Sequence, residues 1–320
     1  MWMLAAVQEH GADVVNAAAG HGAAENEAFN AGETIIHHIA NTAGHPVIHL
    51  PKVLGIDFSI SKHVVMLWLV ASIVFGLITW IVRRYLKHAE RDPVPLGSEN
   101  ALEFAVVWVR DSIVEPNVGK KWVQTWAPLI MTFFAFIFTA NLIGLIPIFE
   151  TLNILNHWIF RAGPDTVFGR LLQGGTTATA NFNVTAGLAL VTFTAIIIAG
   201  SKAHGFFQHW KNIVPPGMAW PLYILLIPIE ILGMLVKPFA LTMRLAANMT
   251  GGHMAILLVL SLVMLFSEMF NAWAGIGVAP VSVILAAGIS GLELIVVLVQ
   301  AYVFTLLSAV FIGLVIHVHH

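Results

Sequence analysis

The chain has 320 residues, of which 58% are hydrophobic and only 10% are charged, whereas about 25% of the residues of an ordinary soluble domain are charged. With a mean hydropathy of +0.85, this composition predicts an all-α protein that crosses a membrane several times. The net charge of −2, without a lysine and arginine stripe, argues against nucleic-acid binding. The absence of cysteine excludes disulfides and cysteine-based metal sites.

The N-terminal part of the chain differs in composition from the rest. Residues 1–60 are rich in alanine, glycine, asparagine and histidine, so we expect a soluble, external extension ahead of a membrane domain over residues 61–320. Four of its histidines lie close together: His37, His38, His45 and His49. A metal site there would need an acidic or cysteine partner at fixed spacing, which the pattern lacks, so we interpret the segment as a polar tail.

A first membrane span is predicted over residues 64–82, an uncharged stretch of about the 20 residues needed to cross the hydrocarbon core. Basic residues follow at once: Arg83, Arg84, Lys87 and Arg91. The positive-inside rule places this end in the cytoplasm and the N-terminus outside. The next segment is predicted to be an amphipathic helix at the cytoplasmic interface. Its apolar residues recur at helical spacing: Leu102, Val106, Val109 and Ile113.

Two further spans of ordinary length are predicted over residues 122–149 and 182–200, with an external loop between them that is poor in lysine and arginine. Two long helices should follow, over about 221–270 and 279–316, joined by the segment NAWAGIGVAP. Each exceeds the roughly 25 residues of an upright span, so both should be strongly tilted or bent. Two prolines would bend the first of them: Pro228 and Pro238. The C-terminus then returns to the cytoplasm.

Polar residues are unusually frequent on the first long helix. Glu230, Lys237 and Arg244 are spaced seven apart and therefore form a stripe on one side of the helix. Asn248 roughly shares that side. His253, nine residues after Arg244, points the opposite way, about 13.5 Å along the helix. The arginine and the histidine are thus predicted to face different surroundings.

The last helix carries a second polar pair, because Glu293 and Gln300 are also seven apart and share a face. The short connection makes the two long helices antiparallel neighbours. His253 and Glu293 then lie at roughly comparable distances from that connection. A histidine beside a carboxylate can relay protons, because histidine titrates near neutral pH.

Several of these residues also allow a structural interpretation. Lys237 and Glu230 can lie near the cytoplasmic interface, where a lysine side chain reaches water. Asn248 or Gln300 alone can hydrogen-bond neighbouring helices together. Glu268 is expected in or near the external loop, in contact with solvent.

Arg244 has no such simple explanation. An uncompensated arginine at the bilayer centre costs roughly 2.5–3.5 kcal/mol on insertion scales. No acidic residue lies three or four positions from it, so its partner must lie elsewhere in this chain or on another protein. Its neighbours are small enough to let another helix approach closely: Ala246, Ala247, Gly251 and Gly252.

Four motifs, taken in order, resemble the a subunit of the membrane sector of F-type ATP synthases. The strongest is KPFALTMRLAANMTGGH, which is similar to the family's pattern around its single essential arginine. The other three are NLIGLIP, TANFNVTAGLAL and LVQAYVFTLLSAVF. The resemblance covers most of residues 64–316.

The resemblance implies a stator proton channel whose two half-channels load and unload protons on the carboxylates of a rotating c-subunit ring. Arg244 would face the ring and keep the half-channels apart, and Glu230 would lie in the cytoplasmic half-channel. The external half-channel would be lined by Asn248, His253, Glu293 and Gln300. His253 and Glu293 show the swapped arrangement of the family's acidic and histidine pair. His253 favours protons over sodium as the transported ion, because a histidine relay offers nothing to Na⁺.

The chain departs from some family members in the external access route. Asn181 and Gly144 stand where some members carry an aspartate. Polar side chains that would still hydrate this route are Asn141, Asn181 and Asn183.

The resemblance also implies partners and a location. The partners would be the c ring, the b-subunit peripheral stalk and the rest of the complex, in an energy-transducing membrane such as the bacterial inner membrane. The subunit would need no cofactor and would not be an enzyme by itself, and no G-x-x-x-x-G-K-[ST] phosphate loop is present. The alternative is a secondary transporter, which predicts internal repeats with broken helices, whereas the intramembrane charges here all lie in the last third of the chain.

Overall fold

Most of the predicted membrane domain is described by the computed structural model. The described residues are 61–88, 97–146, 178–211 and 220–317, with the single positions 59, 94, 95, 156 and 166. Over these ranges the protein is all-α, and five helices are long and apolar enough to cross a membrane, as predicted. The predicted extension over residues 1–60, with its histidines, lies outside the described residues apart from Ser59.

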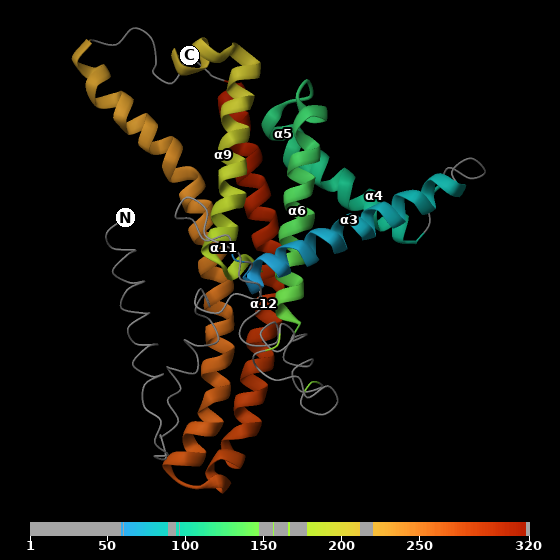
Figure 1. Cartoon of the computed structure of the whole chain (residues 1–320), viewed down its shortest axis with the longest axis vertical. Coiled ribbons are helices and arrows are strands. Elements are labelled where there is room, and N and C mark those ends of the chain that lie inside the picture. The colour runs from blue at the N-terminus through green and yellow to red at the C-terminus, as the bar shows by residue number, and fades with distance from the viewer. Residues whose placement is uncertain are drawn as a thin grey trace.

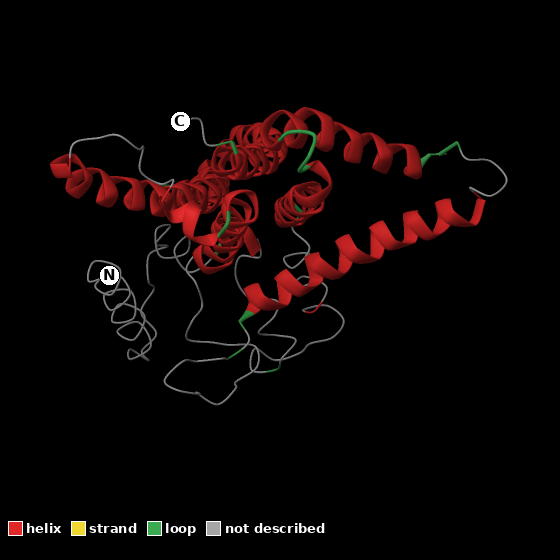
Figure 2. Ribbon diagram, turned by 90° about the horizontal axis from the view of Figure 1, so that it is seen from above, coloured by secondary structure: helices red, strands yellow, loops and turns green. Residues whose placement is uncertain are grey.

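The helices follow the predicted order along the chain. The long ones are α3 (Lys62–His88), α4 (Ser98–Val109), α6 (Val123–Leu145), α9 (Phe182–His204), α11 (Trp220–Met269) and α12 (Ala272–Ile316). The short ones are the π-helical turn η1 (Arg110–Val114), α5 (Glu115–Val118), the 3₁₀ turn η3 (Ala178–Ala180) and α10 (Phe206–Lys211). α6, α9, α12 and most of α11 run side by side (Figure 1), whereas α3 and α4 extend to one side across this bundle (Figures 1 and 2).

The lengths of α11 and α12 decide how the bundle can lie in a membrane. α11 has 50 residues and α12 has 45, which makes them about 75 and 68 Å long at a rise of 1.5 Å per residue. The hydrocarbon core is about 30 Å thick, so neither helix can stand upright in it. α3 has 27 residues and is about 40 Å long, which suits an upright span.

α11 changes direction along its length, as the sequence predicted (Figure 1). Both prolines expected to bend it, Pro228 and Pro238, lie inside the helix. A proline ring crowds the preceding turn and has no N–H to donate, so the helix opens there. The Thr242 hydroxyl donates to the Pro238 carbonyl oxygen at 3.0 Å and adds a hydrogen bond beside this bend.

The prediction that the segment NAWAGIGVAP forms a loop is wrong, because α12 begins at Ala272 instead of 279. Only Phe270 and Asn271 separate the two helices. The Asn271 side chain caps α12 by accepting a hydrogen bond from the Ala274 backbone N–H at 2.9 Å. Glycine and proline are loop signals in water, but in a largely apolar segment a continuous helix satisfies the backbone polar groups better than a loop does.

Two other predicted ends also shift by a few residues. α6 ends at Leu145 instead of 149, because Pro147 follows and favours an extended conformation of Ile146 (φ −83°, ψ 120°). α9 continues to His204 instead of 200 and ends where Gly205 takes φ 90°, a conformation that glycine adopts readily.

The predicted amphipathic segment is helical from Ser98 to Val118, through α4, η1 and α5. Its apolar face is covered by protein only in the second half, because Val109 and Ile113 are buried whereas Val106 is 37% exposed. The buried half packs against α6 and α12. Its position at the cytoplasmic interface remains a prediction.

The C-terminal end of α12 is held by two histidines. The His204 Nε2 atom on α9 lies 3.1 Å from the Ile316 carbonyl oxygen, and the His317 Nε2 atom lies 3.1 Å from the Val118 carbonyl oxygen at the end of α5. In the middle of the bundle, the hydroxyls of Thr192 and Ser308 lie 3.3 Å apart between α9 and α12. These contacts fix the position of α12 along its neighbours.

The close approach of α11 and α12 beside their turn gives a stability prediction. A Cβ on Gly275 would lie 2.8 Å from the Ser267 Cβ and from the Val263 carbonyl oxygen. Gly275→Ala should therefore lower the free energy of unfolding by about 1–3 kcal/mol, the usual cost of overpacking. The measurement is unfolding by sodium dodecyl sulfate in mixed micelles, followed by circular dichroism.

Gly277→Ala is the matched control, because a Cβ at Gly277 meets nothing within 4 Å. Equal stability changes in the two variants would contradict the close packing at Gly275.

Candidate functional site

Two polar contacts join α11 to α12. The Asn248 Nδ2 atom donates to the Gln300 Oε1 atom at 2.9 Å, and the His253 Nδ1 atom lies 3.7 Å from the Glu293 Oε1 atom. On both helices the second pair lies closer to the turn than the first: His253 lies closer than Asn248 on α11, and Glu293 lies closer than Gln300 on α12. Antiparallel helices require this order. The structure therefore brings together four of the predicted site residues, in two successive pairs.

The Glu293 side chain is more deeply buried than that of His253. It is 5% exposed, whereas that of His253 is 27% exposed. Neither carboxylate oxygen accepts a hydrogen bond from the described residues, and 3.7 Å is slightly longer than a hydrogen bond. An imidazole and a carboxylate at this separation form a pair that can exchange a proton once a hydrogen bond joins them.

The role of Gly252 at this site was not predicted from the sequence. A Cβ on it would lie 2.5 Å from Glu293 Oε1 and 2.8 Å from Glu293 Cδ. The glycine was expected to make room for another helix beside Arg244, but it makes room for Glu293 of the same chain. The signal available in the sequence was its position next to His253.

Arg244 lies on the outside of the chain. It is exposed, and it forms no ion pair with the residues that the structure describes. Ala247, Asn248 and Gly251 follow it at helical spacing and are exposed as well, so they form one outward face with it. Asn248 belongs both to this face and to the pair with Gln300.

Lys237 and Glu230 lie further from these pairs. The Lys237 ammonium group is 5.6 Å from the centre of the Phe311 ring on α12, a cation–π contact that gives this lysine a structural partner within the chain. Glu230 is half-buried and precedes Arg244 by about 21 Å along the helix. The structure does not bring Glu230 near His253 or Glu293.

The three asparagines predicted in the access route have different surroundings. Asn141 on α6 is buried and accepts a hydrogen bond from the Thr179 hydroxyl at 2.5 Å. Asn181 is buried and caps α9 by accepting from the Asn183 backbone N–H at 2.8 Å. Asn183 itself is exposed. Thr179, in η3, was not among the predicted site residues.

The described residues contain no cluster of three or more histidine, aspartate or glutamate side chains able to hold a metal ion. The amide, imidazole and carboxylate groups that α11 and α12 bring together can form hydrogen bonds and transfer protons. An exposed arginine on the same helix adds one fixed positive charge.

Comparison with known proteins identifies the family. The sequence profile described as ATP synthase A chain matches residues 64–313. The chain belongs to this family. The family resemblance predicted from the four motifs is thereby confirmed, and the chain is a multi-pass membrane subunit of ATP synthase, not a catalytic subunit on its own.

Curated relatives from several bacteria agree with this assignment. ATP synthase subunit a 2 of Chlorobium luteolum is 36% identical over 97% of this chain and 87% of its own length. ATP synthase subunit a 2 of Prosthecochloris aestuarii is 37% identical over 95% of this chain and 85% of its own length. ATP synthase subunit a of Anaeromyxobacter dehalogenans is 34% identical over 99% of this chain and 76% of its own length.

The Asn248–Gln300 hydrogen bond predicts energetic coupling between these two positions. In a cycle of Asn248→Ala, Gln300→Ala and the double variant, we expect a coupling energy of about 0.6 kcal/mol and at most about 1.7 kcal/mol, the average and the maximum measured for interhelical hydrogen bonds in a membrane protein. The measurement is again unfolding by sodium dodecyl sulfate. A cycle of Asn248 with Val299, which is 49% exposed, is the control and should show no coupling. Equal coupling in both cycles would contradict the contact.

Proposed function

We propose that this chain is the stator proton channel of an F-type ATP synthase. Two half-channels would load protons onto, and unload them from, the carboxylates of a rotating c-subunit ring. Membership of the ATP synthase A chain family supports this proposal. The polar contacts between α11 and α12 supply groups that can carry the protons.

The face around Arg244 is the proposed contact with the ring. An exposed arginine on a helix inside the apolar part of the chain needs a partner, and the described residues offer it none. Ala247 and Gly251 beside it are small and exposed, so a helix of another subunit can approach closely. A ring carboxylate that passes Arg244 would be held ionised by the adjacent cation.

The observation that carries the proposal is the position of Asn248. It is exposed beside Arg244 and also hydrogen-bonded to Gln300. We propose that it links the His253–Glu293 pair to the face that we assign to the ring. A proton would pass from the external side through this pair, then past Gln300 and Asn248, to a ring carboxylate.

Glu230 is proposed to belong to the cytoplasmic half-channel. Along α11 it precedes Arg244 by about 21 Å, whereas His253 follows Arg244 by about 13.5 Å. Arg244 thus lies between the two polar regions, where a fixed positive charge opposes direct proton passage. We further propose an external route with Asn141, Asn181 and Asn183, of which Asn141 and Asn181 are buried near η3 and Asn183 is exposed.

The orientation and the partners belong to the same proposal. We place the N-terminus outside and the C-terminus in the cytoplasm of an energy-transducing membrane such as the bacterial inner membrane, because basic residues cluster at the C-terminal end of α3. The c ring and the b-subunit peripheral stalk would be neighbours in the complex. Each proton that crosses 100 mV releases about 2.3 kcal/mol, so several must be coupled to rotation for each ATP.

The deciding experiment uses Arg244→Ala in inverted vesicles that carry the assembled complex. Without the fixed cation, the protonation equilibrium of a ring carboxylate should change by about 10- to 1000-fold, so ATP-driven acidification should be lost. Passive proton leak, measured after removal of the soluble catalytic sector, should rise. Both are followed with a pH-sensitive fluorescent dye.

Arg110→Ala is the matched control, because Arg110 is exposed and pairs with Asp111 outside the candidate membrane spans. It should leave pumping and leak unchanged. Normal pumping by an assembled Arg244→Ala complex would refute the assignment of Arg244 to the ring.

The contact between Gly252 and Glu293 gives a second functional prediction. Gly252→Ala should displace the Glu293 carboxyl group and lower passive proton flux by roughly tenfold or more, because misplacement by about 1 Å commonly has effects of this size. Gly187→Ala on α9 is the control, since a Cβ there meets nothing within 4 Å. Unchanged flux in Gly252→Ala, with the complex assembled, would exclude Glu293 from the path.

A further inference from the structure

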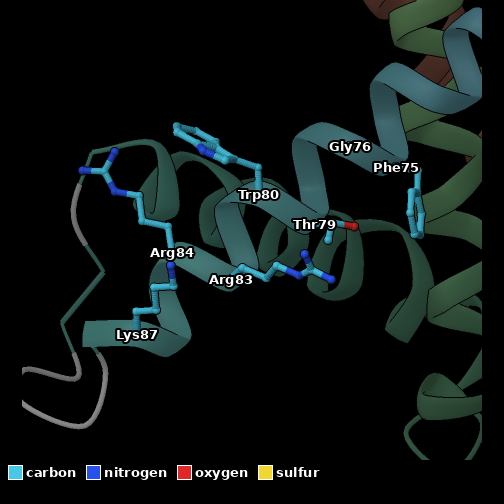
Figure 3. Close-up of a pocket in the computed structure, with 7 residues that line it drawn as sticks. All are labelled: Phe75, Gly76, Thr79, Trp80, Arg83, Arg84 and Lys87. Carbon is cyan, nitrogen blue, oxygen red and sulfur yellow. The ribbon is translucent and has the colours of Figure 1, made fainter.

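A hollow of about 570 Å³ lies on the face of α3, and all the described residues that line it belong to this helix (Figure 3). Gly76 and Thr79 form its middle, with the aromatic side chains of Phe75 and Trp80 on either side (Figure 3). Basic side chains line the end of the hollow toward the C-terminus of the helix. An apolar trough therefore leads directly into a positively charged region.

The spacing of the lining residues explains this shape. At 100° per residue, Gly76, Arg83 and Lys87 fall within about 40° of one another around the helix axis. Phe75 and Trp80 lie to the two sides of this line. A Cβ on Gly76 would meet nothing within 4 Å, so the missing side chain leaves an open space and is not required by packing within the chain.

The hollow carries an excess of positive charge. None of the described residues that line it is acidic. Arg84 already has partners within the protein. Its Nε atom lies 3.5 Å from the buried Glu99 carboxylate on α4, and its guanidinium group is 5.8 Å from the Trp80 ring. Neither Arg83 nor Lys87 forms an ion pair within the described ranges, and both are exposed.

The middle of the hollow faces away from the described helices on which α3 packs. α3 packs on its neighbours through Met66, Val70 and Ile81, which are buried, and this face lies about 120° around the helix from Gly76. Phe75 is 74% exposed and Trp80 is 55% exposed. In a helix with the length of an upright span, such a face meets lipid.

We propose that this hollow binds an anionic phospholipid. One acyl chain would lie over Gly76 between Phe75 and Trp80, and the headgroup phosphate would lie between Arg83 and Lys87. Basic residues beside the cytoplasmic end of a membrane helix attract anionic headgroups, and tryptophan is favoured at headgroup depth. The positive charge of Arg83 and Lys87 favours a headgroup such as glycerol, which adds no compensating ammonium group.

The experiment uses the assembled ATP synthase in nanodiscs, with a fluorophore on a cysteine introduced at Leu86. The chain has no other cysteine, and Leu86 is 60% exposed beside Lys87. Quenching by spin-labelled phosphatidylglycerol and by spin-labelled phosphatidylcholine then gives the local preference between the two lipids. We expect a preference for phosphatidylglycerol.

Two variants test the site in different ways. The double variant Arg83→Gln, Lys87→Gln should lower the preference for phosphatidylglycerol by about fivefold to thirtyfold. A basic residue that contributes about 1 kcal/mol accounts for about fivefold, and two such residues account for about thirtyfold. Gly76→Leu fills the hollow without changing its charge and should weaken quenching by both lipids. The matched control is the double variant Lys120→Gln, Lys121→Gln, which removes two other exposed lysines and should leave the preference unchanged.

Three results would overturn the proposal. Equal quenching by the two lipids in the wild-type background would show that the hollow does not select charge. An equal loss in the Lys120 and Lys121 control would show diffuse attraction instead of a site. Quenching by neither lipid would show that another protein covers this face of α3.

Discussion

The pairing of polar side chains between α11 and α12 is the constraint on which the rest of the arrangement depends. In an apolar environment, a side chain such as Asn248 or Glu293 is costly unless another polar group meets it. The two helices meet this requirement with successive contacts, Asn248 to Gln300 and His253 to Glu293. The turn of only two residues fixes their register, and Gly252 supplies the space for Glu293.

The rest of the bundle holds this pair of helices in place. α12 is fixed at its C-terminal end by His204 and His317, and about two turns before that end by the contact between Ser308 and Thr192. α6 and α9 cover its inner face, so Phe304 and Ile312 are fully buried. The support lies on one side only, and the opposite side of α11 carries the exposed Arg244. Support on one side and an open polar face on the other are what the proposed contact with a rotating ring would require.

Helix length links this arrangement to the membrane. α11 and α12 are too long to stand upright in the bilayer, whereas α3 has a suitable length and runs across them (Figure 2). A strongly tilted α11 would bring a long stretch of the helix to membrane depth. That geometry allows Glu230 and His253 to lie on either side of Arg244 without leaving the membrane region, which an upright helix would not permit.

The sequence by itself determined the five apolar helices, their order, and the helix faces that carry His253 and Glu293, because hydropathy and helical spacing are local properties. It also determined that Arg244 lacks a nearby acidic residue. Only the tertiary structure decided that α12 begins at Ala272, that Gly252 serves Glu293, that Asn248 reaches Gln300, and that Lys237 packs on Phe311. Each of these depends on the distance between two helices, which no spacing within one helix contains.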